Sequence, residues 1–102
     1  MRKRNRIPTH PGGILKRHYL EPLSISISQL SVQIGVSRKT LSKILNERGK
    51  VTPEMALRLS KALGTTPELW LNLQNKYTLW HTENAIPEIV KIELIEGIEK
   101  AS

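Results

Sequence analysis

The stretch 26–46, SISQLSVQIGVSRKTLSKILN, constrains the fold of this chain more than any other segment. Leu30 and Ile34 are four residues apart, which places them on one face of a short helix. Ser31 is small, as a residue must be where two helices cross closely. Gly35 follows at the point where a tight turn needs a residue that tolerates positive φ. The spacing therefore predicts two short helices joined by a tight turn.

The second of these helices is predicted to have one apolar and one basic face. Ser37 is placed to cap its start, and Val36 fills the angle before it. The residues of its buried stripe are Leu41, Ile44 and Leu45. The residues left on its outer face are hydrogen-bond donors, namely Arg38, Lys39, Ser42 and Lys43. This arrangement is typical of a helix-turn-helix that reads DNA, although an ordinary helical hairpin with a solvated basic face is the alternative.

The capping residues define the boundaries of both helices. Ser26 and Gln29 are three residues apart, as in a reciprocal capping box. Ser37 is expected to cap the second helix alone, because Thr40 is not the acidic or amide partner that such a box needs.

The charge of the chain is concentrated in its first half. The net charge is +7. Residues 1–50 carry eleven Lys or Arg against Glu21 and Glu47, for +9, whereas residues 51–102 carry five against seven Glu, for −2. A segregated positive region is the footprint of a phosphate binder. A basic protein with no polyanionic partner is the alternative that charge alone leaves open.

Composition argues against several other classes of protein. The chain contains no cysteine, which excludes disulfides and thiolate metal sites and fits a cytoplasmic location. Its histidines, His10, His18 and His81, do not pair with a second ligand at metal spacing. No apolar run approaches the ~20 residues of a membrane span. We therefore expect no enzyme activity, no metal, no cofactor and no membrane association.

Three further helices are expected around this pair. The first is predicted from Pro11 to Leu20, where Glu21-Pro22 stops it. Its apolar side is expected to hold Ile14, Leu15, His18 and Tyr19.

The last two helices share one opening pattern. Thr52-Pro53-Glu54 and Thr66-Pro67-Glu68 each provide a cap, a proline in the first turn and an acid near the helix dipole. Gly64 ends the former helix, whose inner side holds Ala56, Leu59 and Leu63. The large apolar residues of the latter are Leu69, Trp70, Leu73, Tyr77 and Trp80.

The chain is thus predicted to be all-α, with one five-helix domain and two end segments. Residues 1–9 are expected to form a flexible basic arm, 10–82 the helix-turn-helix domain and 83–102 a C-terminal tail. The alternation of Val90, Ile92 and Leu94 suits a strand, whereas Ile89, Ile92 and Ile95 suit a helical stripe. The conformation of the tail stays open between these two.

With these residues in view, the chain resembles the HigA family of bacterial antitoxins, within the Cro/repressor (XRE) helix-turn-helix superfamily. The resemblance covers about residues 10–80. The segments that carry it are HPG at 10–12, LEPL at 20–23, GVSRKTLS at 35–42, TPEMALRL at 52–59 and PELWLNLQ at 67–74. The last two separate this family from generic repressors of the superfamily.

The resemblance implies a lambda-repressor-like, usually dimeric fold that binds double-stranded DNA at the operator of its own operon. The implied protein partner is a toxin similar to RelE, a ribosome-dependent mRNA endonuclease. Carried onto this chain, the DNA-facing residues are Ser37, Arg38, Lys39, Ser42 and Lys43. A regulator of the same superfamily without a toxin partner is the alternative function.

The chain departs from the family pattern at two positions. The first residue of the helix that starts near position 27 is often a phosphate-binding glutamine, but it is Ile27 here, free to pack against Ile25 or a neighbouring helix. Position 13 is often glutamate and is Gly13 here.

Two further sites are predicted outside the recognition helix. Arg48 and Lys50 follow it in a polar loop, where they either contact phosphate or are merely solvated. The residues expected to join two protomers are Leu73, Tyr77 and Trp80. The toxin is expected either on the tail or on the N-terminal helices.

Overall fold

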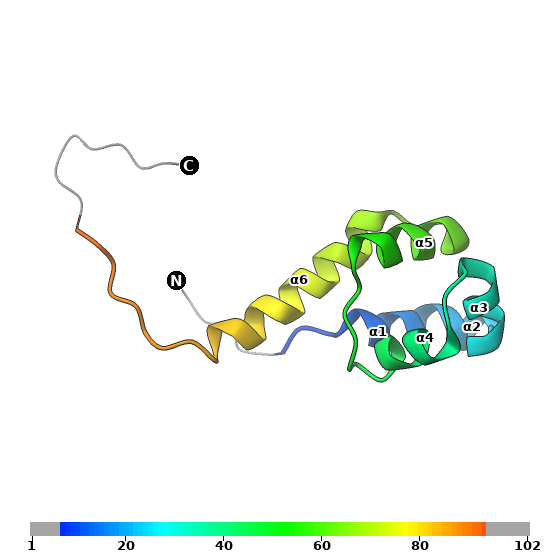
Figure 1. Cartoon of the computed structure of the whole chain (residues 1–102), viewed down its shortest axis with the longest axis horizontal. Helices are drawn as coiled ribbons and strands as arrows, with labels where there is room; N and C mark the ends of the chain where they lie inside the picture. The colour runs from blue at the N-terminus through cyan, green and yellow to red at the C-terminus, as the bar shows by residue number, and fades with distance from the viewer. Residues whose placement is uncertain (1–6, 94–102) are drawn as a thin grey trace.

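The computed structural model describes residues 7–93, which form helices and no strand (Figure 1). Elements α1 (Pro11–Ile14), η1 (Leu15–Leu20) and α2 (Glu21–Leu23) follow one another without a break and form one helix. The other four are α3 (Ile27–Ile34), α4 (Arg38–Leu45), α5 (Pro53–Leu63) and α6 (Pro67–Glu83). The predicted all-α fold is confirmed.

The first helix does not stop at Glu21-Pro22, so that prediction was wrong. It continues to Leu23 and ends at Ser24, which has a φ of 55°. The segment before the proline is a π-helix, in which the Glu21 N–H donates to the Lys16 carbonyl five residues back. Proline lacks an N–H and its ring crowds the carbonyl four residues earlier, and the wider π-turn relieves both problems.

The predicted apolar side of this helix is correct except for one residue. Leu15 is fully buried, and Ile14 and Tyr19 pack against the core. His18 is exposed instead. An imidazole gains little from burial without a hydrogen-bond partner, and the structure leaves this side chain in solvent.

The predicted helix-turn-helix boundaries are confirmed. The Ser26 hydroxyl accepts from the Gln29 N–H and the Gln29 side chain accepts from the Ser26 N–H, which completes the capping box. Gly35 lies in the left-handed region, with a φ of 73°. The Ser37 hydroxyl accepts from the Thr40 N–H and also donates to the Thr40 hydroxyl, at 2.9 Å. Local side-chain chemistry thus fixes both ends of the turn.

The core is aliphatic around one tryptophan. Trp70 of α6 is fully buried, and its indole N–H donates to the Thr65 hydroxyl at 2.8 Å. The predicted inward-facing residues of α3, α4 and α5 are also buried, among them Leu30, Leu41 and Leu59, except that Leu63 is only partly buried. One large ring that packs against several helices compensates for the absence of phenylalanine.

The start of the first helix lies directly on the end of α4. A Cβ on Gly12 would overlap the carbonyl oxygen of Ile44, so any larger residue would push the two helices apart. His10 caps this helix and is 3% exposed. The sequence segment HPG therefore combines a cap, a first-turn proline and a close helix approach.

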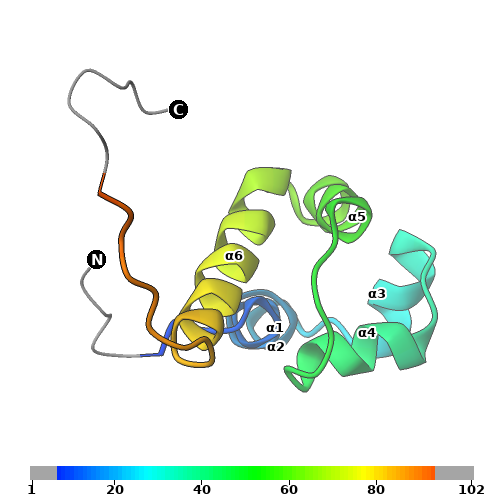
Figure 2. The same cartoon turned by 60° about the vertical axis from the view of Figure 1, so that its left-hand side comes forward.

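The C-terminal half of α6 extends beyond the other helices, and the following residues lead away from them (Figures 1 and 2). Residues 87–93 form neither strand nor helix, which corrects both predictions for this part of the tail. Ile89, Val90 and Ile92 are exposed there, with no neighbouring strand or apolar surface to order them. Leu94 and Ile95, and most of the predicted basic arm, lie outside the described residues.

Candidate nucleic-acid interface

The outer face of α4 carries the residues predicted to contact DNA. Arg38, Lys39 and Lys43 are exposed, as is the cap Ser37, and Ser42 is half-buried. The apolar stripe on the opposite side is buried, so the orientation of the helix is fixed and these donors project outward. The structure therefore brings all five onto one surface.

Asn46 belongs to the same surface, although its polar sequence context predicts that it belongs to the following loop. Its side-chain N–H donates to the Ser42 hydroxyl, at 3.4 Å. The spacing of four residues from Ser42 was the available signal, because such residues share a helix face. An amide that is partly free can both donate to and accept from a base edge.

A surface hollow of about 440 Å³ adjoins this face where the first helix, α3 and α4 meet. Ser42 and Asn46 of the α4 region line it, as do Lys16 and Glu21 of the first helix. Ile27, which is 37% exposed, lines it together with Ile25. Ile27 at the start of α3 thus lines the same hollow as Ile25, its predicted neighbour. Lys16 lines it too and is a cation near α4 that sequence reasoning missed.

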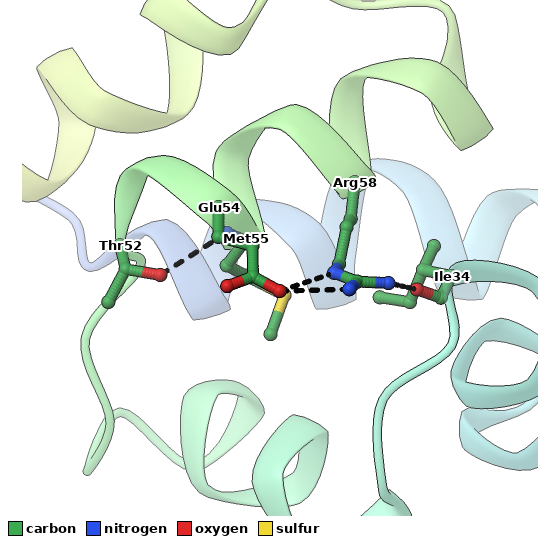
Figure 3. A network of polar contacts seen from close by, with 5 residues as sticks. All are labelled: Ile34, Thr52, Glu54, Met55 and Arg58. Atoms are coloured by element: carbon green, nitrogen blue, oxygen red, sulfur yellow. Dashed lines mark hydrogen bonds and ion pairs between the residues drawn. The ribbon is translucent and has the colours of Figure 1, made fainter.

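A guanidinium from α5 holds the end of α3 in place (Figure 3). One nitrogen of Arg58 donates to the Ile34 carbonyl at 2.6 Å, and two others donate to one Glu54 carboxylate oxygen, at 2.8 and 3.1 Å. A Cβ on Gly35 would lie 3.0 Å from the same guanidinium. Gly35 is therefore required both for its φ and for the space that Arg58 occupies.

Arg48 and Lys50 are exposed on the loop that follows α4. The predicted dimer residues lie elsewhere, on α6, where Leu73, Tyr77 and Trp80 are each half-buried. The Trp80 indole nitrogen is the one buried side-chain polar atom without a hydrogen-bond partner among residues 7–93.

Other kinds of site find no support in the part of the chain that the structure describes. Residues 7–93 contain no cluster of three or more His, Cys, Asp or Glu suited to a metal ion. None of their helices is both long and apolar enough to cross a membrane.

A helical domain that projects a capped, basic second helix from a glycine turn defines the helix-turn-helix class of DNA-binding proteins. The helix-turn-helix family model matches residues 17–70. An uncharacterized HTH-type transcriptional regulator of Haemophilus influenzae is 48% identical over 78% of this chain and 74% of its own length. Antitoxin HigA-1 of Vibrio cholerae is 43% identical over 89% of this chain and 86% of its own length.

A solved structure agrees with these relatives. Pseudomonas aeruginosa antitoxin HigA with the higBA promoter is similar over 76% of this chain and 85% of that one, with 35% identity and a TM-score of 0.74. The chain belongs to the HigA family of helix-turn-helix antitoxins and regulators.

The Arg58 contact generates a prediction about stability. Arg58→Met keeps the apolar stem but removes the donors to Ile34 and Glu54. We expect it to lower the free energy of unfolding by about 1–2 kcal/mol, as for loss of a hydrogen bond from a charged donor. Urea denaturation measures this change.

The matched control is Glu54→Gln, which keeps an acceptor for Arg58 and the bond to Ile34. Because Arg58 and Glu54 form an exposed pair four residues apart, its loss should cost less than about 0.5 kcal/mol. Equal stability of Arg58→Met and the unchanged protein would contradict a role for this contact.

Proposed function

We propose that this protein binds the operator of its own operon, represses it, and neutralises a RelE-like mRNA endonuclease toxin. The observation that carries the DNA-binding part is the outer face of α4. Arg38 and Lys39 occupy its first turn, where the side chains of a recognition helix reach base edges. Ser37, Ser42 and Lys43 complete the proposed contact surface, and a cytoplasmic location follows from this role.

Phosphate contacts are proposed to come from cations around α4. Arg48 and Lys50 follow its C-terminal end in the loop, and Lys16 lines the same hollow as Ser42. Such contacts fix the register of a protein on the duplex without reading sequence, and they account for most of the salt dependence of binding. The HigA structure with its promoter supports a DNA-bound role for this fold.

A two-fold dimer is proposed to form through α6. A single half-site gives little specificity, whereas two recognition helices about 34–36 Å apart meet successive turns of the major groove. The C-terminal half of α6 extends past the other helices (Figure 1). It includes Tyr77 and Trp80. Leu73, Tyr77 and Trp80 are each half-buried, so part of each side chain is left for a second protomer to cover.

The tail is proposed to hold the toxin. Ile89, Val90 and Ile92 are 76%, 86% and 77% exposed, which is unusual for three aliphatic residues so close together. An extended apolar segment is suited to adding a strand to a partner. Glu88 and Glu93 complement the basic surface of an RNA-binding enzyme. Toxin binding through the N-terminal helices is the competing arrangement.

A regulator without a toxin partner is the second candidate function. The similarity to the Haemophilus influenzae transcriptional regulator favours it. A toxin-sized gene beside this one separates the two functions.

The first prediction concerns the operator. We expect Arg38→Ala and Lys39→Ala each to cost about 1–3 kcal/mol in binding free energy, the value of a bidentate base contact. Mobility shifts at several salt concentrations measure this loss. Removing the predicted arm cations Arg2, Lys3 and Arg4 should mainly reduce the salt dependence.

The control removes the same charge elsewhere, through Lys61→Ala with Lys76→Ala. These residues are exposed on α5 and α6, away from the α4 surface. If the Arg38→Ala, Lys39→Ala double variant binds the operator as tightly as this control, α4 is not the DNA reader.

The second prediction concerns assembly. Trp80→Ala removes the largest side chain of the proposed interface, so we expect a larger dimer dissociation constant by sedimentation at micromolar protein. Leu79→Ala is the control on the same helix, since adjacent helix residues face different directions. A monomer mass for the unchanged protein at all concentrations would rule out the dimer.

The third prediction concerns the toxin. Truncation after Glu83, and Ile89→Ser with Val90→Ser and Ile92→Ser in the full chain, should abolish co-purification with the product of the adjacent gene. Val32→Ser with Leu57→Ser changes exposed apolar residues elsewhere and serves as the control. Full toxin binding by the truncated protein would assign the toxin to the helical domain instead.

A further inference from the structure

The loop between α4 and α5 carries Arg48 and Lys50 and is anchored by two buried side chains from distant parts of the chain. Its own backbone bonds return to α4, where the Arg48 and Gly49 N–H groups donate to the Lys43 carbonyl at 2.8 and 3.1 Å. Beyond Gly49 the chain leaves α4. Side chains from the first helix and from α6 contact the backbone there.

The first anchor is His10, at the start of the first helix. Its Nδ1 accepts from the Gly12 N–H at 2.8 Å, so the ring proton must lie on Nε2. Nε2 then donates to the Gly49 carbonyl at 3.0 Å. One neutral tautomer of a buried imidazole thus both caps a helix and holds the residue between Arg48 and Lys50.

The second anchor is Gln74 of α6. Its Oε1 accepts from the Val51 N–H at 2.8 Å, and its Nε2 donates to the Thr78 hydroxyl at 3.0 Å. Gln74 is 7% exposed, so this amide is committed to its two partners. His10 and Gln74 therefore bind the backbone immediately before and after Lys50.

The surroundings allow little movement of this loop. Gly12 lies directly on the Ile44 carbonyl, and the ring of Tyr77 meets the His10 ring edge-on with centroids 4.7 Å apart. The first helix, the end of α4 and α6 thus meet at His10. Displacement of any of them alters the position of the loop.

We propose that His10 and Gln74 are positioning residues that hold Arg48 and Lys50 at a fixed place beside the recognition helix, so that the loop clamps a DNA phosphate. The inference rests on the proposed operator binding and adds a consequence to it. The clamp requires the neutral form of His10, because a proton on Nδ1 would face the Gly12 N–H. Operator affinity should therefore fall on acidification.

The direction of this pH effect follows from the burial of the ring. Burial lowers the pKa of His10 below its usual 6.5, and the bond to Gly49 and the charge of Glu47 oppose this in part. With the folded pKa below the unfolded one, the stabilisation is complete above about pH 6.5 and is lost as the pH falls through the folded pKa. The other charged or titratable groups around the site are Arg48 and Lys50 in the loop and Tyr77 and His81 on α6.

An overall gain of positive charge on acidification should by itself strengthen binding to DNA, which is a polyanion. A loss of affinity below pH 6.5 is therefore not a general property of a basic protein that gains charge. Such a loss points to the buried ring of His10 rather than to a general gain of surface charge.

The test uses two isosteres of histidine in the full-length protein. His10→Asn keeps an acceptor near Nδ1 but has no atom that reaches Gly49, whereas His10→Gln places an N–H near Nε2. We expect His10→Asn to weaken operator binding about 5–30-fold and to reduce the salt slope by about 0.9 for each phosphate that the loop no longer neutralises. His10→Gln should recover most of the affinity and should keep it as the pH is lowered from 7.5 through the folded pKa of His10, whereas the unchanged protein and the His18→Gln control should lose it.

Gln74→Leu releases the loop from its other end and should also reduce the salt slope, which keeps the test valid if His10→Asn does not fold. The proposal is overturned if folded His10→Asn or Gln74→Leu keeps the affinity and salt slope of the unchanged protein, or if Arg48→Ala with Lys50→Ala leaves them unchanged. Those outcomes overturn the phosphate clamp alone. The proposed operator binding stands if the Arg38→Ala, Lys39→Ala variant still loses affinity for the operator. Absence of operator binding by the unchanged protein would instead refute the proposed function.

Discussion

The contact of Gly12 with the carbonyl of Ile44 is the constraint on which the rest of this structure depends. It lets the first helix lie directly against the end of α4, so that α4 is supported along its buried side. Leu15 of the first helix and Leu41 of α4 are both fully buried and belong to the same core cluster. A short helix of this kind has little stability of its own, so its outward donors are ordered only because its inner face is packed.

The parts of the fold that depend on local chemistry could be predicted from the sequence. The Ser26–Gln29 capping box, the Ser37 cap and the turn at Gly35 each need residues within a few positions of one another, and all three form as expected. The helix end at Pro22 was mispredicted because a proline forbids only an ordinary α-turn. Whether a π-turn replaces it depends on the packing around the helix, which a local rule does not include.

The contacts that organise the candidate site were beyond sequence reasoning. Arg58 to Ile34, Val51 to Gln74 and His10 to Gly49 join residues 24, 23 and 39 positions apart. Spacing rules describe one helix or one turn, and they do not say which distant backbone N–H or carbonyl a side chain will contact. The outer face of α4 was predictable for the opposite reason, since periodicity alone separates its donors from its buried stripe.

Helix α6 separates its apolar and polar faces only weakly. The reason is that successive turns of this helix contact three different parts of the protein. Trp70 fills the core, Gln74 one turn later binds the loop after α4, and Tyr77 one turn further contacts His10. A buried amide without a partner would destabilise a helix that only covers a core. The Gln74 amide avoids this cost because it accepts from the Val51 N–H. Because a helix is stiff over three turns, the proposed dimer surface and the proposed phosphate clamp are rigidly connected. We therefore expect the proposed dimer formation and the proposed operator binding to be thermodynamically linked, so that each strengthens the other by the same factor.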